Sequence, residues 1–171
     1  MFSFPNPVNE KAARVVAGVV AIAGITILAT GAYWLLVPVA YGFWARVLTG
    51  PTLSPLGRFA MRVAAPRLGP PKHVPGPPKR FAQGMGAALT TTAAVLALGF
   101  GAETAAGALV IALVAAATLE SAFAFCLGCQ VFAGLVRLGL VPEAVCAQCA
   151  DITLARGRPD HVGRRPSPRA R

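Results

Sequence analysis

Two long stretches without a basic residue constrain the fold of this chain most strongly. No Lys or Arg occurs from Val15 to Ala45 or from Phe81 to Val136, and the only acids in these stretches are Glu103 and Glu120. The stretches are 31 and 56 residues long, whereas one membrane span needs roughly 20 apolar residues. Each stretch can therefore hold two spans. Only 13% of the chain is charged, against about 25% in ordinary globular domains, so we predict an integral membrane protein.

The predicted fold class is all-α, with four transmembrane helices in two hairpins and a short cytoplasmic Cys-rich helical extension. We expect spans at about 12–30, 32–48, 81–99 and 104–125. Pro38 falls inside the second span, which membrane helices tolerate when neighbours or water satisfy the freed carbonyl. The first and second spans, and likewise the third and fourth, are joined by turns too short to hold a further element.

The distribution of the 16 basic residues predicts the orientation of these spans. They all lie at the start of the first span or before it, between the end of the second span and the start of the third, or after the fourth. The positive-inside rule then places both termini and the central segment in the cytoplasm. This distribution also accounts for the net charge of +10 without a nucleic-acid partner. Glu10 interrupts the basic start of the chain and no small-residue cleavage site follows, so we expect the first span to be retained.

The domain organisation follows from the same pattern. Residues 1–150 are predicted to form one membrane domain, and residues 151–171 a basic, disordered tail. The loop at 49–80 is basic and Pro-rich, which favours an extended, polyproline-like chain. Alternatively, residues 56–65 form a short basic amphipathic helix that lies on the inner leaflet with its apolar side chains toward lipid.

All four cysteines of the chain fall into two Cys-x-x-Cys pairs. These pairs are Cys126–Cys129 and Cys146–Cys149, and 16 residues separate them in the Cys-rich segment 126–150. Two such pairs are typical of a four-thiolate metal site, with sulfur about 2.3 Å from a zinc ion. Each pair alone is also typical of a dithiol redox couple. A reducing cytoplasm disfavours a permanent disulfide, so the metal and dithiol interpretations both remain open.

In the dithiol interpretation, Cys126 and Cys129 open a helix at about 130–138, whose N-terminal dipole lowers the pKa of the first thiol. The second pair then relays electrons or sulfur to a soluble partner. Glu120 is the one acid inside a predicted span away from its outer turn, and a buried acid requires a partner. Gln83 and Arg80 are the candidates for that partner. The functional alternative is that Glu120 accepts protons during thiol chemistry.

Four short motifs together resemble a known family. They are Asn6-Pro7-Val8-Asn9-Glu10 before the first span, Ser54-Pro55-Leu56 in the loop, Pro78-Lys79-Arg80-Phe81-Ala82 at the third span, and Phe125-Cys126-Leu127-Gly128-Cys129 after the fourth. Over about residues 5–150 the chain resembles domain of unknown function 4395, a family of small bacterial integral membrane proteins. The resemblance implies a multi-pass protein of the bacterial cytoplasmic membrane, and it carries no established activity to transfer.

The sequence lacks the motifs of several common enzyme classes. The sequence has no phosphate-binding Gly-rich loop, no Ser-His-Asp set and no paired carboxylates, so hydrolase and kinase functions lack the residues they need. The leading hypothesis is a cytosol-facing membrane thiol protein that handles electrons or sulfur for a soluble thiol or sulfur-transfer protein. The alternative is a non-enzymatic membrane scaffold whose four cysteines bind structural zinc, with iron as the second choice. Whether the protein is an enzyme stays open.

Overall fold

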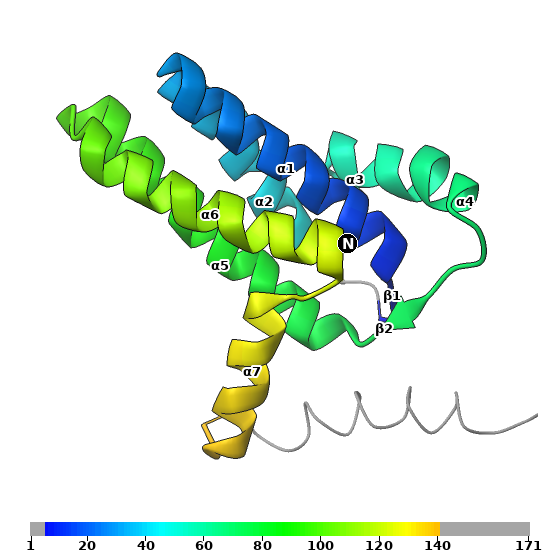
Figure 1. The fold of residues 1–171 in the computed structure, drawn as a ribbon. Helices are drawn as coiled ribbons and strands as arrows, with labels where there is room; N and C mark the ends of the chain where they lie inside the picture. Colours follow the sequence, from blue (N-terminus) through cyan, green and yellow to red (C-terminus); the bar gives the residue numbers. More distant parts are fainter. Residues whose placement is uncertain (1–5, 141–171) are drawn as a thin grey trace, which may run out of the picture.

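The structure, a computed structural model, describes residues 6–140 and is all-α apart from two short strands (Figure 1). Its helices are α1 (Glu10–Thr30), α2 (Leu36–Thr49), α3 (Pro55–Phe59), α4 (Ala65–Arg67), α5 (Gly76–Ala94), α6 (Glu103–Phe123) and α7 (Leu127–Arg137). A 3-10 turn covers Tyr33–Leu35, and π-helical turns cover Ala60–Ala64 and Val95–Gly99. Strands β1 (Val8–Asn9) and β2 (His73–Val74) pair antiparallel. The predicted all-α class is confirmed.

Three helices in the described residues are long and apolar enough to cross a membrane. They are α1, the continuous helix Gly76–Gly99 formed by α5 and its π-helical turn, and α6. Their large exposed side chains are apolar, with Ile22 67% and Ile111 59% exposed, which suits lipid contact. By contrast, α2 has only 14 residues and is about 21 Å long at a rise of about 1.5 Å per residue. It is therefore shorter than the span predicted at 32–48.

Proline explains why several helices begin where they do. Pro38 lies in the first turn of α2, where a missing N–H leaves no hydrogen bond unmade. Likewise, α5 begins at Gly76 and carries proline in its first turn, although the sequence predicted its start near residue 81. Pro55 opens α3 directly after Ser54, whose hydroxyl accepts from the N–H of Gly57 at 3.1 Å. In each case the fixed φ of proline favours the first helical turn.

The central segment therefore differs from the extended loop predicted at 49–80. Its residues Pro55 to Arg67 are helical and lie against α1, with Ala60 and Ala65 buried. Phe59 remains 52% exposed, so this segment matches the alternative prediction of a short amphipathic helix. After it, β2 pairs with β1 and ties the segment to the start of α1, where Glu10 N–H donates to the carbonyl of Lys72 at 2.8 Å.

The helices pack as a bundle in which α1 lies along α6 and α2 lies along α5 (Figure 1). Among the described residues the buried core is built largely from alanine and valine, with Phe43 of α2 and Phe132 of α7 as its large aromatic residues. Small side chains let backbones approach closely, which is how helices associate in lipid. Gly86 shows this most clearly, because a Cβ atom there would overlap the ring of Phe43.

The end of α6 is closed by a side chain from α1. The Arg14 guanidinium donates to the carbonyls of Ser121 at 2.9 Å and Ala122 at 3.0 Å, which satisfies groups left free at a helix C-terminus. Ala124 then adopts a left-handed conformation with φ of 57°. This turn directs α7 back onto the first turns of α5, where the rings of Phe81 and Phe132 lie 5.7 Å apart.

Replacing Ala124 with glycine is expected to stabilise the fold by about 0.5–1 kcal/mol. Among residues 6–140, Ala124 is the one non-glycine residue with positive φ, and that conformation costs an L-residue about 1–2 kcal/mol. Part of the gain is offset by the larger backbone entropy that glycine loses on folding. Chemical unfolding in detergent micelles measures the change. Ala115→Gly, at an exposed helical position of α6, is the matched control and should lose about 1 kcal/mol. Equal losses in both variants would contradict the prediction.

Candidate thiol site

A buried ion pair and two thiols gather at the end of the bundle where α5 begins and α6 ends. The Lys79 ammonium lies 2.5 Å from Oε1 of Glu120, and the two side chains are 8% and 15% exposed. Cys126 and Cys129 follow directly on the turn after α6. We call these four residues the thiol site.

The partner of Glu120 differs from the two residues that the sequence suggested. Arg80 donates from Nε to the carbonyl of Val47 at 3.1 Å, and Gln83 accepts from Arg46 at 2.7 Å. The partner of Glu120 is instead Lys79. Because α5 begins at Gly76, this lysine belongs to the first turn of the helix and not to the loop. The expectation that Glu120 has a buried partner is confirmed, but its identity could not be read from the apolar pattern.

Arg46 is a second buried cation near this end of the bundle. Its side chain is 6% exposed, its Nη1 donates to the hydroxyl of Ser54 at 3.3 Å, and its guanidinium lies over the ring of Phe43 at 4.6 Å. Sequence reasoning counted it only among the charges that orient the spans. The available signal was its position directly at the end of an apolar stretch, one turn after an aromatic residue.

The two described cysteines lie at the N-terminus of α7. Cys126 is the N-cap residue in an extended conformation, and its carbonyl accepts from the N–H of Gln130 at 3.1 Å. The helix begins at Leu127, so Cys129 lies within its first turn and not before the helix predicted at 130–138. Within the described residues both thiols are free, with Cys126 buried and Cys129 half-buried. Gly128 between them packs against Ala82 of α5.

The two thiols differ in acidity. Hydrogen bonding with the Cys129 thiol lowers the pKa of Cys126 below its ordinary value, and the positive charge of Lys79 adds to this effect against burial and the charge of Glu120. The same hydrogen bonding, together with burial, raises the pKa of Cys129. The helix N-terminus also favours an anion at this position. Cys126 is therefore the thiol that ionises first.

A cavity of about 80 Å³ adjoins the thiol site inside the bundle. Cys126 and Glu120 line it together with Gln83, and most of the remaining lining is apolar and comes from α1, α5 and α6. The acidic thiol therefore borders an internal space, while Cys129 lies closer to the surface. This arrangement places a carboxylate and a thiol beside the same cavity.

The predicted four-thiolate site falls partly outside the described residues, because Cys146 and Cys149 lie beyond residue 140. Among residues 6–140, no group of three or more His, Cys, Asp or Glu side chains could hold a metal ion. Cys126 and Cys129 would by themselves supply two of the four ligands that structural zinc takes. The metal interpretation therefore stays a prediction.

The comparisons with known proteins identify the family. No curated protein and no solved structure matches the chain. The family model described as "Domain of unknown function (DUF4395)" matches residues 8–137, a shorter stretch than the 5–150 over which the motifs suggested a resemblance. The match includes the whole thiol site and ends before Cys146. Because it covers well over half of the 171 residues, the chain belongs to the DUF4395 family.

Proposed function

We propose that this protein is a membrane thiol protein whose Cys126 and Cys129 form a reversible dithiol–disulfide couple. The observation that carries the proposal is the pair of free thiols at the start of α7, beside a buried lysine and with unequal pKa values. Reactive thiols in proteins occur at helix N-termini and near cations, because both stabilise the thiolate. The partner is a soluble cytosolic protein that carries a disulfide.

Oxidation of the thiol pair needs no reagent other than the partner, and a reduced cytosolic thiol returns the pair to its starting state. The Cys126 thiolate attacks one sulfur of the partner's disulfide, forms a mixed disulfide and releases the partner's other sulfur as a thiolate, which takes up a proton. Cys129 loses its proton, for which Glu120 is the candidate acceptor, and attacks the sulfur of Cys126. The Cys126–Cys129 disulfide forms, and the partner leaves as a dithiol that has gained two electrons. A reduced cytosolic thiol reverses these steps and restores the couple.

The proposal also includes four spans, with the thiols on the cytoplasmic side of a bacterial inner membrane. In addition to the three long helices, the span that comes second in the chain consists of α2 and the 3-10 turn before it, which together cover residues 33–49. All basic residues of the described part belong to segments at the end of the bundle that carries the thiols, as the positive-inside rule requires for a cytoplasmic face. The opposite end, with the turns at Gly31 and Gly101, carries Glu103 as its one charged residue.

The competing function is a membrane scaffold in which four cysteines bind structural zinc. It is favoured by one observation, the proximity of two free thiols whose spacing matches half of a four-thiolate site. In that case the ion would protect all four thiols together, and neither pair would act alone. Transfer of sulfur as a persulfide would use the same thiol pair as the redox reaction. The two reactions differ in the partner, which carries a persulfide in sulfur transfer and a disulfide in the redox reaction.

Alkylation in a Cys146→Ser/Cys149→Ser background tests the dithiol function. The rate of modification of Cys126 should rise with pH around a midpoint below about 8.5, the ordinary pKa of a free thiol. Cys129→Ala removes the hydrogen-bond donor that lowers the pKa of Cys126, so the midpoint should move upward. Cys129→Ser keeps a donor and is the matched control, in which the midpoint should stay close to its original pH.

Metal analysis of the unmodified chain, purified anaerobically, distinguishes the two functions. The dithiol function predicts metal-free protein in which Cys126 is alkylated fastest. One zinc ion per chain, with all four thiols protected from alkylation until a chelator is added, would contradict it. An alkylation midpoint that is the same in Cys129→Ala and Cys129→Ser would show that the thiols do not interact as a pair.

A further inference from the structure

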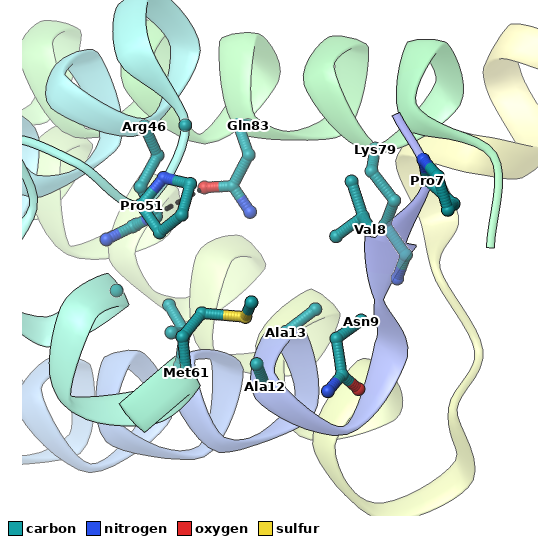
Figure 2. Close-up of a pocket in the computed structure, with 13 residues that line it drawn as sticks. Pro7, Val8, Asn9, Ala12, Ala13, Arg46, Pro51, Met61, Lys79 and Gln83 are labelled. Carbon is teal, nitrogen blue, oxygen red and sulfur yellow. Dashed lines mark hydrogen bonds between the residues drawn. The ribbon is translucent and has the colours of Figure 1, made fainter. Parts of the chain in front are cut away.

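A second cavity, which we call the Arg46 cavity, shares Gln83 in its lining with the first. It also measures about 80 Å³ and is bordered by β1, the start of α1, the end of α2, the helical segment after Ser54 and the first turns of α5 (Figure 2). Most of its lining is apolar. Four side chains with nitrogen atoms border it: Asn9, Arg46, Lys79 and Gln83.

The polar groups that remain available around this cavity are hydrogen-bond donors. An arginine side chain can only donate, so the Gln83 atom that lies 2.7 Å from Arg46 Nε must be the oxygen. The NH2 group of Gln83 therefore points into the cavity, as Figure 2 shows. Asn9 is fixed in the same way, because its oxygen accepts from the N–H of Lys11 at 3.0 Å. Within the described residues, neither NH2 group makes a hydrogen bond to the protein.

The positive charge of Arg46 also lacks an anionic partner in the described part of the chain. The two ion pairs there join Glu10 to Lys72 and Glu120 to Lys79, whereas Arg46 donates only to the neutral oxygens of Gln83 and Ser54. Its Nη2 is buried and has no hydrogen-bond partner among residues 6–140. A buried charge of this kind is costly unless an opposite charge compensates it.

We propose that the Arg46 cavity binds a phosphate group. Arg46 supplies a positive charge that no carboxylate in the described residues pairs with, and the NH2 group of Gln83 donates from a second direction, which suits an anion with several oxygens. A water molecule needs about 10–15 Å³ of such space, so the cavity has room for a group of several atoms. The phosphate comes from an anionic lipid headgroup or from solution. The cavity adjoins the thiol site and shares Lys79 with it, but the proposal does not rest on the proposed thiol function.

Binding can be measured with the full chain in nanodiscs of phosphatidylcholine. The probes are inorganic phosphate added to the buffer and phosphatidylglycerol added to the nanodisc, each read as a rise in the midpoint of thermal unfolding. Gln83→Glu replaces the NH2 donor with a carboxylate that still accepts from Arg46 and compensates its charge. We expect this variant to stay folded and to bind the effective probe at least ten-fold more weakly. Gln130→Glu makes the same charge change at an exposed position of α7 and should bind as the original chain does.

The outcomes separate the two sources of phosphate from an absence of binding. A response of the original chain to inorganic phosphate supports a soluble ligand, and a response to phosphatidylglycerol alone supports a lipid headgroup. In either case the response must be lost in Gln83→Glu and in Arg46→Met, which removes the charge at similar volume. No response to either probe would overturn the proposal. An equal response in the original chain and both variants would also overturn it, because exposed arginines would then account for the binding.

Discussion

Replacing Lys79 with methionine is expected to destabilise the fold by about 3–5 kcal/mol. The substitution leaves the carboxylate of Glu120 only 15% exposed and without its ammonium partner. Breaking a buried pair from one side is costly because the remaining charge stays out of water, and in a bundle of apolar helices few groups can replace the partner. The free energy of unfolding in detergent micelles, measured with a chemical denaturant, gives the size of the effect.

Two further variants show whether the cost comes from the unpaired charge. Lys79→Met combined with Glu120→Leu removes both charges, and apolar replacement of a buried pair is often neutral or stabilising, so the double variant should recover most of the loss. Lys72→Met breaks the other ion pair, in which the lysine side chain is 52% exposed. It should cost less than about 1 kcal/mol. A loss in Lys79→Met as small as that in Lys72→Met would contradict the burial of the Lys79–Glu120 pair.

The apolar helices could be predicted from the sequence because their pattern is independent of tertiary contacts. A stretch without charge that is long enough for a span has few alternatives in lipid, and α1 and α6 lie close to their predicted bounds. Asn9 caps α1, since its side chain accepts from the N–H of Lys11 as an N-cap residue does.

Proline was the main source of error, because the same residue both ends and begins helices. The segment 49–80 was read as extended on account of its prolines, yet Ser54-Pro55 and Pro77-Pro78 stand at the starts of helices. Composition does not distinguish these cases. What decides them is the residue before the proline and the apolar surface that the new helix can bury, here Ala60 and Ala65 against α1.

The site was predicted by residue type but not by partnership. Glu120, Cys126 and Cys129 could be named from the sequence, because an acid in an apolar helix and a Cys-x-x-Cys pair are uncommon patterns. Lys79 and Arg46 could not be assigned to the interior, since their positions depend on where α5 begins and how α2 packs on it. Which cation meets which acid is a property of the bundle and not of either helix alone.

Replacing Gly86 with leucine is expected to destabilise the bundle by about 3 kcal/mol, at the upper end of the cost of overpacking. A Cβ atom at this position would overlap the ring of Phe43, which is 7% exposed and belongs to the core between α2 and α5. The ring cannot move aside easily, because Arg46 lies over its face. Unfolding in detergent micelles measures the loss.

The control lies on the same helix. A Cβ atom at Gly84 meets no atom of the surrounding structure within 4 Å, so Gly84→Leu should cause no loss and should stabilise the helix by up to about 1 kcal/mol through its better helix propensity. Phe43→Ala alone leaves a cavity and is costly, but in the Gly86→Leu background the leucine fills part of that space. The double variant should therefore be more stable than the sum of the two losses predicts, by about 1–3 kcal/mol. Strict additivity would mean that Gly86 and Phe43 do not meet, and that α2 does not pack on α5 at this point.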